Sequence, residues 1–239
     1  MSPAEKEGFV KNNFFPGKKH PLFIIRNGIV QKVQQYQHHM YGHMLDFGCG
    51  AKPYKTLFKN VSAYTGVDYQ GDGHSHADED IEFYYDGKVL PFGDSSFDCI
   101  FSTEVFEHIF NLPEILLELY RVLKPGGSIF ITCPFVWNEH EVPIDYARYT
   151  LFALKELFKN AGFSITIADK SGDFNLALGQ LRVLYFNDYF TIKFPAFIQK
   201  IFRHLGVPLL NNWYIFKSEV LPKNNSLYLN NICIAKKIS

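Results

Sequence analysis

A short apolar stretch that runs into a carboxylate and two glycines most constrains how this chain can fold. Residues 44–50 read Met-Leu-Asp-Phe-Gly-Cys-Gly, which predicts a buried strand that ends in a tight turn. Gly48 and Gly50 can adopt positive φ and carry no Cβ, so the backbone can turn sharply there and a ligand can approach it closely. The stretch therefore predicts a cofactor-binding turn, with Asp46 and Cys49 beside the two glycines.

A second acidic residue, Asp68, lies at a position suited to binding a ribose. Residues 63–68 predict another strand, which ends at Asp68 and is followed by Tyr69. Asp68 lies roughly 20 positions after Asp46, and in a strand-helix-strand unit that offset puts an acid at the tip of the neighbouring strand. There its carboxylate can accept both hydrogen bonds of a ribose diol.

Strands and helices alternate over the middle of the chain. Apolar runs at 97–103, 128–135 and 163–168 predict strands, and residues 113–123 and 151–158 repeat apolar side chains at helical spacing. Residues 54–58 suit a short helix after the glycine turn. Such alternation predicts an α/β fold with a Rossmann-like, doubly wound parallel sheet and helices on both faces. Ligands bind at the carboxyl ends of such strands, and Thr103 falls at one of these ends.

A turn at Asp86 and Gly87 offers a site for an adenine edge. A carboxylate can accept from an exocyclic amine while a neighbouring backbone N–H donates to a ring nitrogen. A simple surface turn is the alternative, and it would be favoured if the pair stood alone.

The composition excludes several classes of protein. Lysine plus arginine equals aspartate plus glutamate at 24 each, so no overall field favours nucleic acid. The four cysteines are far apart, which suggests reduced core thiols in a cytoplasmic protein. The N-terminus does not read as a signal peptide, and no apolar run approaches the length that crosses a bilayer.

A polar loop at 71–80 contains residues of metal-ligand type: His74, His76, Asp78 and Asp80. The run lacks a further histidine after it and is not preceded by an apolar strand, so we interpret it as a solvated loop near the ribose. We expect no metal site.

Together, these stretches resemble the class I S-adenosylmethionine-dependent methyltransferases, specifically the small-molecule branch with a Leu-Pro-Phe element. The matching residues lie within 43–135 and comprise 45–50, 66–68, Asp86 ahead of 90–92, 96–98, Glu107 with His108, and 121–127. The resemblance implies a seven-stranded sheet whose last strand, antiparallel, inserts between the fifth and sixth. It also implies S-adenosylmethionine as cofactor. Asp46 and the turn 48–50 would hold its methionine part, Asp68 its ribose, and Asp86 with Gly87 its adenine.

A nicotinamide dehydrogenase is the main competing enzyme on this fold. It would have a third glycine where this chain has Pro53, and the Leu-Pro-Phe and Pro-Gly-Gly elements have no role in it. A relative that binds the cofactor without catalysis is a further alternative.

The loop after the fifth strand, residues 134–150, is the best place for the methyl acceptor. It concentrates titratable and aromatic groups, and similar His-x-x-Pro-x-Asp-Tyr-x-Arg-Tyr elements occur in bacterial methyltransferases associated with surface glycans. We predict that His140 is a general base oriented by Asp145, with His108 as the other candidate. The predicted acceptor pocket is formed by Trp137, Arg148 and Tyr149. The alternative is that Asp145 and Arg148 only pin the loop.

Two appendages flank the predicted core, which spans 43–171 within one domain, 1–239. The first is a helical lid, 1–42, for which covering a sheet edge is the alternative role. The second is an insertion, 172–226, ahead of the last strand at 227–239. Apolar residues of the insertion form one helical stripe with basic residues among them: Phe194, Phe197, Ile198, Ile201, Phe202 and Leu205. Packing on the domain or on a second subunit is the commoner role of such stripes, and contact with lipid is the alternative.

The sequence thus predicts a methyltransferase that acts on a small-molecule acceptor, with an oxygen of a sugar or glycan precursor as the expected target. A lipid or quinone acceptor is the alternative within the enzyme class. Peripheral membrane contact and a homodimer both stay open.

Overall fold

The computed structural model describes residues 2–71 and 80–238. The chain divides into two compact units, which are described separately. The sheet unit comprises Val33–Asp169 and Asn231–Ser239, and the helical unit comprises Met1–Lys32 and Lys170–Asn230. The residues His74, His76 and Asp78, considered above as metal ligands, lie outside the described residues.

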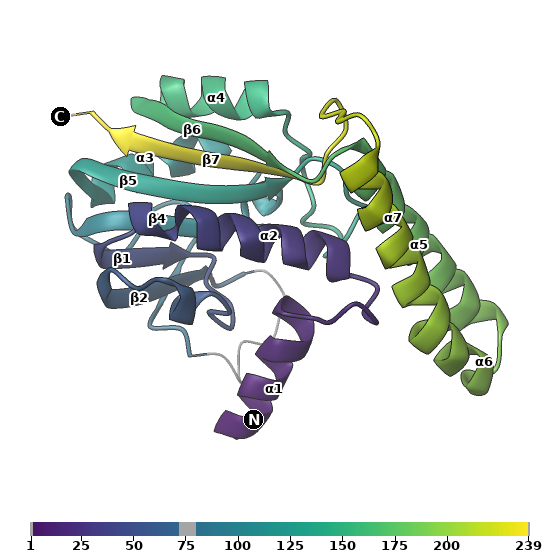
Figure 1. Cartoon of the computed structure of the whole chain (residues 1–239). Coiled ribbons are helices and arrows are strands. Elements are labelled where there is room, and N and C mark those ends of the chain that lie inside the picture. The colour runs from purple at the N-terminus through teal and green to yellow at the C-terminus, as the bar shows by residue number, and fades with distance from the viewer. Residues whose placement is uncertain (1, 72–79, 239) are drawn as a thin grey trace. The chain divides into compact units, whose positions relative to one another are not determined.

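The sheet contains seven strands in the order β3-β2-β1-β4-β5-β7-β6 (Figure 1). β7 runs antiparallel and lies between β5 and β6, so the predicted topology is confirmed. The strands are β1 (Gly42–Phe47), β2 (Val61–Tyr69), β3 (Phe83–Tyr85), β4 (Phe97–Thr103), β5 (Leu123–Pro134), β6 (Phe163–Ser171) and β7 (Asn230–Lys237).

Helices cover both faces of this sheet because side chains alternate along each strand. Ile129 and Ile131 of β5 belong to a buried core with α3 (Leu112–Val122) and α4 (Leu151–Asn160). Phe130, which points the other way, meets the ring of Tyr36 at the end of α2 (Phe23–Tyr36), with the ring centroids 6.2 Å apart. The predicted helices on both faces are therefore present.

The parallel register brings the ends of β1, β2 and β4 to one edge. Asp46 pairs with Gly66 of β2 on one side and with Phe101 of β4 on the other. Thr103 ends β4 opposite Thr132 of β5. The carboxyl-end residues singled out in the sequence therefore share one edge of the sheet.

The segment after the glycine turn differs from the prediction. Residues 54–58 were expected to form a short helix, but only one 3-10 turn, η2 (Lys55–Leu57), is present. Lys52 there takes a positive φ of 53°, and Tyr54 and Phe58 are buried. Because these aromatic side chains must reach the core within one turn, the backbone does not continue as a regular helix. The side chain of Thr150 accepts from the N–H of Ala153 and caps the start of α4.

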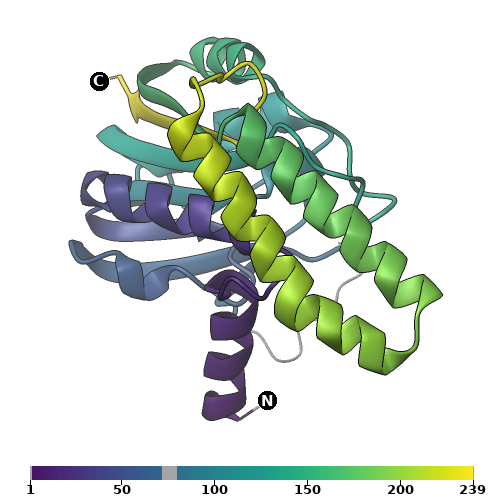
Figure 2. The same cartoon turned by 45° about the vertical axis from the view of Figure 1, so that its right-hand side comes forward.

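The helical unit contains α1 (Pro3–Phe14) and most of the segment predicted as an insertion. Its other elements are α5 (Phe174–Lys193), α6 (Ala196–Ile201), a π-helical turn η4 (Phe202–Gly206) and α7 (Val207–Val220). α5 and α7 lie side by side (Figure 2), and a Cβ on Gly179 would stand only 2.3 Å from the Tyr214 ring. Glycine at this position lets the two helices approach closely.

The start of α2 and the insertion belong to the same unit. The N–H of Ile25 donates to Oε1 of Gln180 at 3.0 Å, and Nε2 of Gln180 donates to the carbonyl of Pro21 at 2.7 Å. The first residues of the chain and the predicted insertion are thus one body, which sequence patterns did not indicate. The lid role of residues 1–42 stays a prediction.

Candidate functional site: the carboxyl edge of the sheet

The turn after β1 has the backbone that only glycine adopts easily. Gly48 and Gly50 have φ of 71° and 43°, and the N–H of Gly48 donates to the Val67 carbonyl at 2.9 Å. A Cβ on Gly48 would lie 2.3 Å from Cγ2 of Val105, the second residue after β4. The turn therefore packs directly on the segment that follows β4, and Gly48 is required for that approach.

The two predicted acids lie on either side of this turn. Oδ2 of Asp68 accepts from the N–H of Gly50 at 2.8 Å, and Oδ1 accepts from the N–H of Tyr69 at 2.8 Å. Asp46 is only 3% exposed and accepts a short hydrogen bond from the Tyr64 hydroxyl. Burial, together with the charges of Asp68 and Glu82, raises the pKa of Asp46 to about 7. A positively charged ligand would offset the cost of ionising this carboxyl.

Three side chains near the turn were not predicted from the sequence: Lys52, Tyr64 and Glu82. Nζ of Lys52 lies 2.5 Å from Oε1 of Glu82, whose Oε2 accepts from the N–H of Gly66 at 2.7 Å. This ion pair ties the residues after the turn to the segment that precedes β3. Each residue is common and stands outside any motif, so no sequence signal marks them.

The predicted adenine site forms a compact turn. Oδ1 of Asp86 accepts from the N–H groups of Lys88 at 2.9 Å and Val89 at 3.0 Å. These backbone hydrogen bonds, that of Val89 first, lower the pKa of Asp86. Gly87 has φ of 82°, and a Cβ there would lie 3.0 Å from the Tyr69 ring. Tyr69, Asp86 and Gly87 therefore lie close together, and their contact with adenine stays a prediction.

The loop between β5 and α4 is organised by one buried ion pair. Nη1 and Nη2 of Arg148 contact Oδ1 and Oδ2 of Asp145 at 2.6 and 2.7 Å. The Asp145 side chain is 3% exposed, and the guanidinium holds its pKa well below its usual range. Arg148 also donates to the carbonyls of Asn138 at 2.8 Å and Trp137 at 3.4 Å. The pair therefore does pin the loop.

The same pair positions His140. Oδ2 of Asp145 accepts from the backbone N–H of His140 at 3.0 Å and lies 3.3 Å from its Nδ1. The carbonyl of Asn138 is also 3.3 Å from Nδ1. Burial, with a smaller contribution from His108, lowers the pKa of His140. The Asp145 carboxylate therefore both fixes the loop and orients the His140 imidazole.

A 3-10 turn, η3 (Phe106–His108), meets this loop. The carbonyl of Glu107 accepts from the N–H groups of Tyr146 at 2.8 Å and Ala147 at 3.2 Å. Nδ1 of His108 lies 2.9 Å from the carbonyl of Ile144, and the rings of His108 and His140 are 4.8 Å apart between centroids. Two histidines that are 32 positions apart in the sequence (140 − 108) thus face each other.

Glu107 is a further residue at this edge to which the sequence assigned no role. Its side chain is fully buried, and neither carboxylate oxygen accepts a hydrogen bond from any described residue. Burial and the charge of Glu104 raise the pKa of Glu107 well above its usual value. Burying a carboxyl group without a hydrogen-bond partner destabilises the folded protein, so a further role for Glu107 is expected.

Comparison with known proteins identifies the domain that carries these features. Residues 45–131 match the family described as "Methyltransferase domain". This match and the methyltransferase relatives support a class I S-adenosylmethionine-dependent methyltransferase domain. The match includes the glycine turn, both predicted acids and the Glu107–His108 pair.

The relatives differ in the acceptors that their names give. The chain is 32% identical over 138 residues to the phthiotriol/phenolphthiotriol dimycocerosates methyltransferase of Mycobacterium leprae, covering 54% of this chain and 51% of that protein. It is 28% identical over 123 residues to the demethylmenaquinone methyltransferase of Tropheryma whipplei, covering 48% and 51%. The chain spans about half the length of these curated relatives.

A solved structure agrees on the fold. The phosphoethanolamine N-methyltransferase 2 of Haemonchus contortus, in complex with S-adenosyl-L-methionine, superposes with a TM-score of 0.54 at 20% identity. The match covers 98% of this chain and 56% of that one.

The site of this methyltransferase domain fits a sulfonium cofactor. The Asp68 carboxylate at the tip of β2 and the buried Asp46 carboxyl offer hydrogen-bond acceptors beside the glycine turn, and a bound cation would favour the ionised form of Asp46. Cys49 is buried beside the turn, and burial raises the pKa of its thiol. All four cysteines are free and buried, as the sequence predicted.

The remaining predicted residues of the methyltransferase domain take structural positions. Oγ1 of Thr103 is 2.8 Å from Oγ1 of Thr132 and joins β4 to β5. Tyr149 packs against the hydrophobic core, and its carbonyl accepts from Nδ2 of Asn231 at 2.8 Å. The Trp137 carbonyl accepts from Arg148. Whether these residues contact cofactor or acceptor stays a prediction.

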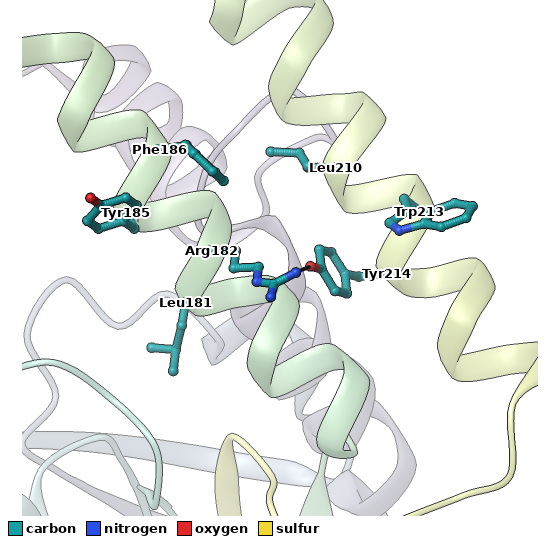
Figure 3. A pocket seen from close by; sticks show the side chains of 7 residues that line it. All are labelled: Leu181, Arg182, Tyr185, Phe186, Leu210, Trp213 and Tyr214. Carbon is teal, nitrogen blue, oxygen red and sulfur yellow. Dashed lines mark hydrogen bonds between the residues drawn. The ribbon is translucent and has the colours of Figure 1, made fainter. Parts of the chain in front are cut away.

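The helical unit has a pocket of its own. It lies between α5 and α7 (Figure 3), where Nη1 of Arg182 donates to the Tyr214 hydroxyl at 2.7 Å. Its other lining residues are mostly apolar: Leu181, Tyr185, Phe186, Leu210 and Trp213. Among the described residues, no helix is both long and apolar enough to span a bilayer.

Proposed function

We propose that this chain transfers the methyl group of S-adenosylmethionine to an oxygen of a small-molecule acceptor, with a sugar or glycan precursor as the first class to test. The observation that carries the proposal is that His140 lies against His108, which belongs to the segment that follows β4. That segment abuts the cofactor turn, since Val105 contacts the Gly48 position. Basic groups beside the cofactor turn suit an acceptor that must lose a proton.

The chemistry sets what the loop must do. When bound, S-adenosylmethionine supplies an electrophilic methyl group: its C–S bond breaks as the acceptor oxygen forms the new C–O bond, and the electron pair stays on sulfur. Most of the acceleration comes from alignment and from the exclusion of water. The hydroxyl proton must go to a base, and we propose that His140 receives it, because Asp145 holds the imidazole in one orientation. His108 is the second candidate.

Replacing the two histidines tests this assignment. A panel of sugar, glycan-precursor and quinol hydroxyls, assayed for release of S-adenosylhomocysteine, would first supply an acceptor. With that acceptor, we expect His140→Ala to lower kcat by about 100-fold or more, since a positioned base contributes on that order. Binding of S-adenosylhomocysteine should not change. If His140→Ala and His108→Ala both keep wild-type turnover, the assignment is wrong.

A lipid or quinone acceptor is a second candidate, favoured by the surface of the helical unit. Large apolar side chains are exposed on α5, α6, η4 and α7: Tyr185, Phe186, Tyr189, Ile192, Phe197, Ile201, Leu205, Leu209, Trp213 and Phe216. Exposed lysine and arginine side chains, Lys193, Lys200 and Arg203, stand among them. Apolar residues mixed with basic ones are typical of a face that lies on an anionic membrane. Several relatives are named for lipid-like acceptors.

Vesicle co-sedimentation tests this second candidate. With vesicles of phosphatidylcholine and phosphatidylglycerol, we expect the wild-type chain to pellet, and we expect Phe197→Glu and Leu205→Glu each to reduce the pelleted fraction several-fold. These side chains are 65% and 69% exposed, so the changes should not disturb folding.

Phe152→Glu is the matched control, because Phe152 is 78% exposed but lies on α4, outside the helical unit. A wild-type chain that stays in the supernatant would remove the lipid-surface proposal. If Phe152→Glu reduced the pelleted fraction as much as Phe197→Glu does, that result would also contradict the lipid-surface proposal.

A further inference from the structure

We propose that Glu107, His108 and His140 form a binding site for a divalent transition-metal cation. Each offers one ligand atom, and the three atoms lie within 4.8 Å of one another. Two imidazoles and one carboxylate are a ligand set suited to zinc, iron(II) or cobalt(II). The inference rests on the proposed function, because the cation would hold the hydroxyl oxygen of the acceptor.

The buried carboxylate is the strongest reason. Glu107 is fully buried, and its two oxygens accept no hydrogen bond from the described residues. Among the described residues, Nε2 of His108 forms an ion-pair contact with it, at 3.8 Å from Oε1. A carboxylate in this state is normally neutralised or paired. A cation held between Glu107 and the two imidazoles would supply the missing partner.

Both imidazoles are prepared to act as ligands through Nε2. Nδ1 of His108 lies 2.9 Å from the Ile144 carbonyl, which can only accept, so the proton belongs on Nδ1. Nδ1 of His140 lies 3.3 Å from both the Asn138 carbonyl and the Asp145 carboxylate, which are also acceptors. Nη2 of Arg148 is 3.3 Å from the same Nδ1, but its two N–H groups donate to these same acceptors, at 2.8 Å and 2.7 Å. A proton on Nδ1 leaves the Nε2 lone pair available. Metal-bound histidines are oriented by the same kind of outer hydrogen bond.

The spacing requires only small side-chain movements. Ligand atoms around a zinc-like cation at about 2.1 Å stand about 3 to 3.5 Å apart. The three ligand atoms lie within 4.8 Å of one another, so rotation of the His140 ring and the Glu107 carboxylate would bring them to coordination distance. Glu141, whose Oε2 is 3.5 Å from Nε2 of His108 and whose side chain is 41% exposed, is available as a fourth ligand. An acceptor oxygen would then complete the coordination.

A cation here would change how the acceptor is activated. A bound cation lowers the pKa of a hydroxyl ligand, so that its proton can leave to water, and fixes the position of the oxygen. In the metal-free protein, the acceptor hydroxyl would transfer its proton directly to His140. In the metal-loaded protein, both imidazoles would act as ligands. The two proposals share the acceptor site and differ in whether activity requires the metal.

Cobalt(II) titration of the full chain tests the site without any acceptor. After treatment with EDTA and removal of the chelator, we expect one Co²⁺ per chain by calorimetry, with a visible absorption spectrum that Zn²⁺ abolishes by competition. Glu107→Gln and His140→Ala should each weaken Co²⁺ binding at least about tenfold. His140→Ala protects the test if Glu107→Gln does not fold, because the His140 side chain is 27% exposed.

Two matched variants control for unspecific binding. Glu114→Gln and His38→Ala remove exposed groups of the same types outside the cluster, and we expect both to bind Co²⁺ like the wild type. The metal site would be overturned if the wild type did not bind Co²⁺ stoichiometrically. It would also be overturned if Glu107→Gln and His140→Ala both bound Co²⁺ as tightly as the wild type does. Binding of S-adenosylhomocysteine is measured in parallel. If the wild type binds Co²⁺ but not S-adenosylhomocysteine, the proposed function is refuted and the metal site is not. If it binds S-adenosylhomocysteine but not Co²⁺, only the metal site is refuted.

Discussion

Gly48→Ala is expected to lower the free energy of unfolding by about 3 kcal/mol and to weaken binding of S-adenosylhomocysteine at least about tenfold. Part of the loss comes from an L-residue at φ of 71°, which costs roughly 1–2 kcal/mol. The rest comes from the new Cβ, which would stand 2.3 Å from Cγ2 of Val105 and force the turn or the segment after β4 to move. Urea unfolding and calorimetry measure the two effects.

Gly126→Ala is the matched control for this change. Gly126 has φ of 77°, nearly that of Gly48, but no atom lies within 4 Å of the position of its Cβ. The control should therefore lose only the backbone contribution, about 1 to 2 kcal/mol, and should bind S-adenosylhomocysteine as the wild type does. Equal cofactor affinities for the two variants would show that the Gly48 turn does not hold the cofactor.

Arg148→Ala is expected to lower methyl transfer by about 100-fold and stability by about 3 kcal/mol, while cofactor affinity stays near that of the wild type. The Asp145 carboxylate, 3% exposed, would lose its two-point contact with the guanidinium. An unpaired buried charge costs about 3 kcal/mol or more. The loop would no longer hold His140, whereas the glycine turn and Asp68 are untouched. Unfolding, turnover and calorimetry are measured on the same preparation.

The double variant Asp145→Ala with Arg148→Ala separates stability from function. Because both charges are removed, no buried carboxylate is left unpaired, and we expect much of the lost stability to return. Turnover should stay low, since neither side chain remains to orient His140. Wild-type turnover in the single variant would contradict the role of this loop in acceptor activation.

The sheet topology and the cofactor edge were predictable because their signals are local. A strand that ends in Asp46 and two glycines, followed by Asp68 at the next strand end, encodes the edge in short stretches of sequence. The order of the strands, with β7 between β5 and β6, came from the family resemblance. Periodicity alone would not have provided it.

The features that could not be predicted depend on contacts between distant residues. Lys52 pairs with Glu82, and Glu107 meets His140, across segments with no shared motif. The union of α1 and the start of α2 with the insertion likewise depends on side-chain contacts such as that of Ile25 with Gln180. The helix expected at 54–58 is reduced to a 3-10 turn at 55–57, between the buried side chains of Tyr54 and Phe58.

Isothermal titration calorimetry with S-adenosylhomocysteine tests whether this chain binds the methyl donor beside the glycine turn. We predict one binding site per wild-type chain and at least about tenfold weaker binding by Asp68→Asn, which keeps the size of the side chain but removes the charge that accepts from Gly50. If the wild type binds neither S-adenosylhomocysteine nor S-adenosylmethionine, the chain is not a methyltransferase that uses this cofactor.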